Sequence, residues 1–105
     1  MTPRQLLSHK LRDGKYRAKH YGCPVDPELT LAAVIDAGFL KINKCYYCGK
    51  DIGDGPGDYT LEHIEPLIKN GPHSLGNICK ACPSCNYGKN IQRWLDWAAE
   101  LDKVS

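Results

Sequence analysis

The chain has 105 residues, a net charge of +2, six cysteines, one phenylalanine and one methionine. A chain of this length buries only about 60–70% of the surface that its unfolded form exposes, so its core is modest and a large multidomain enzyme is excluded. No apolar run approaches the roughly 18 residues that a membrane span needs, so no membrane partner is expected. We therefore expect one domain over residues 1–105, with a basic helical region (1–40) followed by a core (41–105).

The positive charge is concentrated at the amino end of the chain. Residues 1–22 contain six lysines and arginines against one aspartate, whereas carboxylates outnumber lysines over residues 23–85. This asymmetry is typical of an arm that contacts nucleic-acid phosphates, and Arg17 and Lys19 are the candidate contacts. A solvated helix face explains the same charges equally well.

Helical signals divide the amino-terminal region into three segments. Thr2 and Pro3 suit an N-cap and a first turn, and Gly14 is expected to weaken or break the helix that they begin. A basic, aromatic helical segment should resume over residues 16–21. A further helix is expected to begin at residues 26–28 and to end at Gly38, which suits a left-handed C-terminal residue.

The cysteines favour a metal site over disulfides. The first residues lead into a charged segment without the apolar stretch of a secretory signal, so a cytoplasmic, reducing location is expected. Four of the cysteines form two Cys-x-x-Cys pairs, Cys45 with Cys48 and Cys82 with Cys85. Four thiolates bind Zn²⁺ tetrahedrally, and a structural zinc contributes on the order of 10 kcal/mol to the folding of a small domain.

The second pair has an alternative. Cys79 lies three residues before Cys82, so these two could also supply a pair of sulfurs. We prefer Cys82 with Cys85, because Pro83 suits the first turn of a helix that would hold both side chains.

A carboxylate and an imidazole, Glu62 and His63, lie between the two cysteine pairs. They end an alternating stretch, residues 58–63, that predicts a short strand, and a return strand is expected over residues 77–80. Phosphodiester hydrolysis needs a base to deprotonate water and a cation to hold the developing negative charge. A neutral histidine is a suitable base near pH 7. Mg²⁺ or Mn²⁺ prefers oxygen ligands, which Glu62 and the Asn86 amide would supply.

The clearest helix is expected after Pro83, over residues 86–101. At about 100° per residue its apolar side chains share one side. Asn86, Lys89 and Arg93 share another side, where we expect the chemistry.

These motifs carry a resemblance to a known family. The run from Glu62 to Leu67, then Asn70-Gly71, Asn77-Ile78 and Cys82-x-x-Cys85-Asn86-x-x-Lys89, resembles the HNH endonucleases in their four-cysteine zinc form. The resemblance covers about residues 45–89. It implies an α+β fold, a small zinc-stapled ββα-metal core with N-terminal helices, that cleaves DNA to leave 5′-phosphate and 3′-hydroxyl ends.

The resemblance also implies roles for individual residues. His63 would be the general base, with its other ring nitrogen held by a backbone carbonyl, and Asn77 would pin the loop between the strands. Asn86 would ligate the catalytic ion together with Glu62, which stands where the family usually has aspartate. The phosphate clamps would be Lys89 and Arg93.

The expected function is therefore a metal-dependent endonuclease that acts on DNA, most simply double-stranded, with one structural Zn²⁺ and one catalytic Mg²⁺ or Mn²⁺. Two alternatives stay open. One is a non-catalytic, zinc-stabilised nucleic-acid-binding module, and the other is an accessory nuclease subunit of a phage packaging complex. His73 is interpreted as a solvated loop histidine, with a contact to metal or phosphate as its alternative.

Overall fold

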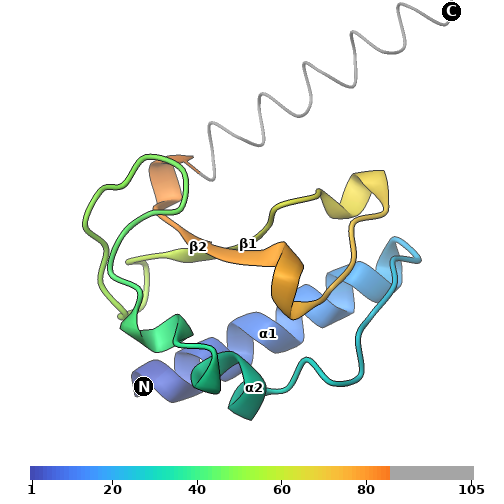
Figure 1. Ribbon diagram of the computed structural model, residues 1–105, viewed down its shortest axis with the longest axis horizontal. Helices are drawn as coiled ribbons and strands as arrows, with labels where there is room; N and C mark the ends of the chain where they lie inside the picture. The colour runs from blue at the N-terminus through green and yellow to red at the C-terminus, as the bar shows by residue number, and fades with distance from the viewer. Residues whose placement is uncertain (86–105) are drawn as a thin grey trace, which may run out of the picture.

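The computed structural model describes residues 1–85 (Figure 1). Two helices, α1 (Pro3–His20) and α2 (Leu31–Asp36), precede a two-stranded antiparallel sheet of β1 (Thr60–His63) and β2 (Ile78–Ala81). This arrangement confirms the α+β class. The helix expected over residues 86–101 lies outside the described residues. Within residues 1–85, no helix combines the length and the apolar character that crossing a membrane requires.

Helix α1 is continuous, so the expectation of a break at Gly14 is wrong. Its start is fixed by a reciprocal capping box, in which Thr2 and Gln5 each accept a hydrogen bond from the other's backbone N–H. The buried positions of α1 follow a helical period along one face, and they are Leu7, Leu11, Gly14 and Ala18. Gly14 is therefore part of the packed face, where tertiary contacts outweigh its weak helix propensity.

Helix α2 begins later than residues 26–28, which instead form a turn. The Asp26 carboxylate accepts a hydrogen bond from the backbone N–H of Glu28 at 2.9 Å, which is a local alternative to helix formation. Thr30 then caps the helix by accepting from Ala33 N–H. Gly38 follows with φ +92°, so its predicted left-handed conformation is confirmed.

One hydrophobic core joins both helices to the sheet. α1 runs along one side of the two strands, and α2 lies beside it (Figure 1). The core side chains come from α1, α2, the following 3₁₀ turn, both strands and the residue before β1, and they are Leu7, Leu11, Val34, Phe39, Tyr59, Leu61 and Ile78. An isolated two-stranded sheet is marginal in water, so packing against α1 is what makes this one stable.

The middle of the sheet carries a buried cation. Lys80 pairs with Leu61 across the strands, and its side chain is only 1% exposed. Its ammonium group donates to the Ile42 carbonyl oxygen at 2.8 Å, forms an ion pair with Asp54, and lies 4.7 Å from the centre of the Tyr59 ring. These contacts satisfy the buried charge and tie the loop before β1 to the sheet.

The connection between the strands makes a tight turn at Gly71. Asn70 before it is left-handed, with φ +66°, and the Gly71 N–H donates to the Pro66 carbonyl oxygen at 2.9 Å. A Cβ on Gly71 would overlap the carbonyl oxygen of Glu65 and lie 2.9 Å from that of Pro66. The turn therefore admits no side chain at this position.

Replacing Gly71 with alanine should destabilise the protein. The obstructing atoms are backbone, so the loop itself must shift, and overpacking of this kind costs about 1–3 kcal/mol. The expected result is a fall of at least about 5 °C in the midpoint of thermal unfolding in excess zinc. Gly76→Ala is the matched control, because no atom lies within 4 Å of a Cβ there and its effect should stay within about 1 kcal/mol. Equal effects of the two substitutions would contradict this account of the turn.

Candidate active site and metal centre

Two tight chain segments bring four cysteines together. Cys45 and Cys48 lie in a turn closed by hydrogen bonds from Cys45 N–H to the Lys50 carbonyl oxygen at 2.8 Å and from Gly49 N–H to the Cys45 carbonyl oxygen at 3.0 Å. Gly49 has φ +75°, a conformation that few other residues adopt without strain. Cys82 follows β2 directly, and Cys85 lies in the helical conformation of residues 83–85.

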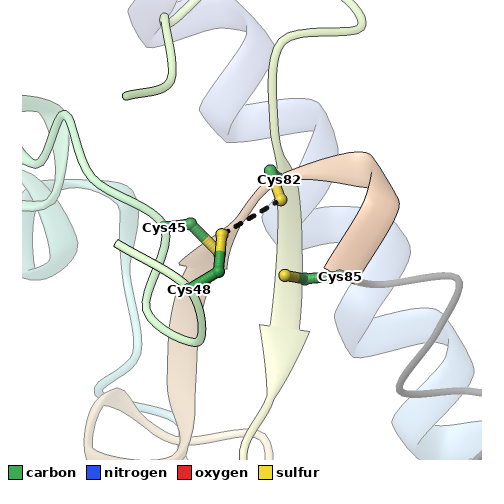
Figure 2. Close-up of side chains that lie close together, drawn as sticks. All are labelled: Cys45, Cys48, Cys82 and Cys85. Atoms are coloured by element: carbon green, nitrogen blue, oxygen red, sulfur yellow. Dashed lines mark hydrogen bonds between the residues drawn. The ribbon is translucent and has the colours of Figure 1, made fainter. Parts of the chain in front are cut away.

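The geometry of the four sulfurs suits a zinc ion. Their Sγ atoms all lie within 4.8 Å of one another, and Figure 2 shows the side chains converging on one point. The sulfurs of Cys48 and Cys82 are 3.8 Å apart. Four sulfurs at about 2.3 Å from a tetrahedral zinc are separated by about 3.8 Å, whereas a disulfide requires about 2.05 Å. The donor set therefore fits a structural zinc.

The charge on the cluster also calls for a cation. Burial acts to raise the pKa of Cys45, but hydrogen bonds from backbone N–H groups, chiefly that of Cys82, outweigh it and lower the pKa to about 6. Hydrogen bonding to the side chains of Cys82 and Cys48 raises the pKa of Cys85 to about 12. Without a metal the cluster thus favours a thiolate at one sulfur and a protonated thiol at another. A bound Zn²⁺ would hold all four as thiolates.

The other two cysteines have separate surroundings. The Cys79 thiol donates to the Tyr47 hydroxyl oxygen at 3.6 Å, and it does not belong to the sulfur cluster. The Cys23 thiol donates to the Leu67 carbonyl oxygen at 3.0 Å. The preferred pairing of Cys82 with Cys85 therefore matches the structure, and the alternative with Cys79 does not.

Glu62 and His63 occupy the last two positions of β1. Glu62 pairs with Cys79 and His63 with Ile78, and both side chains are nearly inaccessible, at 6% and 3% exposure. Adjacent residues of a strand project to opposite faces. His63 shares its face with Leu61 and points towards α1, where its Cε1 atom lies close to Gly14.

Asn77 holds the turn that follows His63. Its amide oxygen accepts from Glu65 N–H at 2.7 Å, and its amide nitrogen donates to the carbonyl oxygens of Glu65 at 3.1 Å and Pro72 at 2.7 Å. The Asn77 carbonyl oxygen accepts from Ile64 N–H at 2.8 Å. One buried side chain thus joins both ends of the connection between the strands, as the resemblance implies.

The expectation that His73 is a solvated loop histidine is wrong. Its side chain is 2% exposed, and its Nδ1 lies 2.9 Å from Nε2 of His63. The two rings are tilted by 45° with their centres 5.2 Å apart. Burial lowers the pKa of His73, and the nearby charges of Lys15 and Arg17 act in the same direction, although the Leu11 backbone opposes them. The ring is therefore neutral at pH 7.

Gly14 is the reason that α1 can cover this pair. A Cβ at this position would lie 2.9 Å from Cε1 of His73 and 3.4 Å from Cε1 of His63. Sequence reasoning missed this contact, although the spacing of Gly14 from Leu7, Leu11 and Ala18 already placed it on the buried face of the helix.

The remaining candidate residues lie either on α1 or outside the described part of the chain. Arg17 and Lys19 are exposed on the last turns of α1, as a phosphate contact requires. Asn86, Lys89 and Arg93 lie outside the described residues, so their places near Glu62 and His63 stay a prediction.

Loss of one clustered cysteine should abolish zinc binding, whereas loss of Cys79 should not. Cys82→Ser removes a ligand from a set of four, and the three remaining sulfurs cannot complete the tetrahedron. We expect the purified parent to contain about one zinc per chain and Cys79→Ser to match it. Cys82→Ser should contain far less zinc, and its midpoint of thermal unfolding should be lower than that of the parent. Metal analysis measures the zinc content, and a thermal unfolding curve measures the stability of each protein. A zinc-free parent, or retention of zinc by Cys82→Ser, would contradict the assignment.

Gly14→Ala should destabilise the protein although alanine is the better helix former. The added methyl group meets buried, hydrogen-bonded imidazoles that cannot rotate away, and overpacking of about 1–3 kcal/mol exceeds the roughly 1 kcal/mol gained in helix propensity. The control is Ser8→Ala on the exposed face of α1, which should stabilise by up to about 0.5 kcal/mol. Chemical unfolding of both variants gives the sign of the change in the free energy of unfolding. Stabilisation by Gly14→Ala would show that the helix does not lie against the histidines.

Comparison with known proteins agrees with this geometry. A search of curated proteins finds no match to the chain. The model of the HNH endonuclease family matches residues 45–92, a range that begins at the first cysteine of the cluster and contains the strands, the two histidines and Asn77. Over this segment, 48 of its 105 residues, the chain is similar to the HNH endonuclease family.

Proposed function

We propose that the protein is a metal-dependent endonuclease that hydrolyses phosphodiester bonds in double-stranded DNA. In this proposal His63 accepts a proton from the attacking water, whose oxygen forms a new bond to phosphorus as the bond to the 3′ oxygen breaks, and the departing 3′ oxygen takes a proton from a solvent water. Glu62 and Asn86 are the proposed ligands of one Mg²⁺ or Mn²⁺, and the products carry 5′-phosphate and 3′-hydroxyl ends.

The observation that carries the proposal is the way in which Asn77 holds the turn after His63. One buried amide accepts one hydrogen bond and donates two, and these three bonds fix the backbone on both sides of the connection, next to the candidate base. A general base must be held within a few tenths of an ångström of its working position. A module that only binds nucleic acid has no need to fix a buried imidazole in this way.

The donor set for the catalytic ion is compatible with a hard cation. Glu62 offers carboxylate oxygens at a position almost closed to water, and Mg²⁺ takes few protein oxygens while keeping water and phosphate as its other ligands. When bound, such an ion stabilises the negative charge that develops on the phosphate.

The charge on α1 supports a nucleic-acid substrate. Lys15 and Arg17 lie close enough to the buried histidines for their charges to act on His73. Together with Lys19, these exposed cations extend along the half of α1 that covers His63. They would attract DNA phosphates to this side of the sheet, in a manner that weakens with salt.

One observation favours the non-catalytic alternative. The His63 ring is 3% exposed, and a base must contact water beside the phosphate. A protein that only binds nucleic acid could keep this ring buried permanently. An accessory nuclease subunit would expose it when a partner displaces part of the surface.

Cleavage of supercoiled plasmid tests the proposal. We expect relaxed or linear products that appear only with added Mg²⁺ or Mn²⁺, and a rate reduced about 10²- to 10⁴-fold in His63→Ala, since that is the usual contribution of a general base. Because EDTA also removes zinc, the metal requirement is measured by leaving out the divalent ion while the zinc content is monitored.

His9→Ala is the matched control, because His9 is an exposed histidine on α1 that contacts Arg12 and not the candidate site. It should cleave at the parent rate. Equal rates for His63→Ala and the parent would refute the role of His63. DNA binding without turnover in any divalent ion would establish the binding module instead.

A further inference from the structure

The structure gives His63 a partner for which the proposed mechanism has no role. Nε2 of His63 and Nδ1 of His73 are 2.9 Å apart, a hydrogen-bond distance, and both rings are buried. A neutral imidazole has one N–H and one lone pair, so the hydrogen bond made by one nitrogen determines which other nitrogen is basic.

The His73 ring is held in place by backbone from two parts of the chain. The His73 N–H donates to the Pro24 carbonyl oxygen at 2.8 Å, and its carbonyl oxygen accepts from Asp26 N–H at 3.0 Å, which makes a short parallel bridge at Val25. On another side, Gly14 lets α1 approach to within contact of the ring. These contacts leave His73 little freedom to move away from His63.

The contact between the two rings indicates which nitrogen of His63 would act as the base. Nε2 of His63 is the atom that faces Nδ1 of His73. A general base presents a lone pair to water, so on His63 this lone pair would be on Nδ1. A neutral His63 of this form carries its proton on Nε2, which can donate to the lone pair on Nδ1 of His73.

We propose that His73 is a positioning residue for His63: it accepts the Nε2 proton of His63 in a hydrogen bond and thereby makes Nδ1 of His63 the basic nitrogen. The assignment rests on the proposed function, in which His63 is the general base. His73 itself does not contact the substrate. Its contribution is the tautomer and the orientation of the ring that does.

Two variants of His73 separate this role from simple packing. In His73→Asn the amide oxygen occupies about the position of Nδ1 and can still accept the proton, whereas His73→Leu fills similar space without an acceptor. Neither change removes the backbone hydrogen bonds of residue 73. His73→Gln is a third variant, because its amide lies one carbon further out, near the position of Nε2.

Nitrogen NMR of the histidine rings reads the tautomer directly, in the zinc-bound protein without DNA. We expect His63 to carry its proton on Nε2 in the parent and in His73→Asn, and to become a mixture of tautomers in His73→Leu. In plasmid cleavage, the kcat of His73→Leu should be about 10- to 100-fold below that of the parent, with a KM within about twofold of the parent value. The kcat of His73→Asn should be close to that of the parent. If His73→Leu does not fold, His73→Asn should still exceed His73→Gln in kcat.

The NMR result decides the proposal even if the protein cleaves nothing, so its failure differs from failure of the proposed function. A parent His63 protonated on Nδ1, or a tautomer unchanged in a folded His73→Leu, would overturn the proposal. Equal loss of kcat in the asparagine, glutamine and leucine variants would also overturn it, because packing alone would then explain the effect.

Discussion

Four cysteine sulfurs crowded into one small volume are the constraint on which the rest of the described structure depends. Thiolates at these separations repel one another, and thiols at the same positions form only weak hydrogen bonds, so a dication is what turns the cluster into a source of stability. The turn that contains Cys45 also touches the sheet directly, because Tyr46 N–H donates to the Lys80 carbonyl oxygen at 2.9 Å. The turn of the cysteine cluster is thereby joined to the strand that leads to Cys82.

The sheet is fixed differently at its two ends. Where Thr60 pairs with Ala81, the next residue along the chain is a cysteine of the cluster, so a zinc ion bound there would hold this end of the sheet. Where His63 pairs with Ile78, the holding group is the Asn77 amide. Coordination bonds to such an ion would contribute on the order of 10 kcal/mol, whereas the hydrogen bonds of the Asn77 amide fix the position of the backbone. The candidate base lies at the second end, where accuracy matters more than strength.

Much of this arrangement could be predicted from the sequence, and the failures share one cause. The cysteine pairs, the two strands and the left-handed Gly38 are encoded within a few residues, so local spacing and turn chemistry reveal them. The local signals at Gly14 conflict, because glycine weakens an isolated helix while its spacing places it on the buried face. The local signal at His73 points the wrong way, because a histidine after Gly71 and Pro72 suggests a surface loop. Their actual surroundings come from residues 24–26 and from α1, distant in sequence from residue 73, and no local pattern encodes that contact.

The close approach of α1 at Gly14 has a consequence for protein engineering. Helix α1 carries exposed basic side chains, so exchanging it would be one way to change which nucleic acid the protein contacts under the proposed function. Its buried face, however, forms part of the wall around the imidazole of His63, the candidate base. A grafted helix would need a glycine at the position of Gly14, because a side chain there would collide with His73. Without it, the graft would displace the two histidines as well as change the exposed face. Retargeting is therefore better attempted through the outer face of α1, by changing exposed side chains while its buried face is kept.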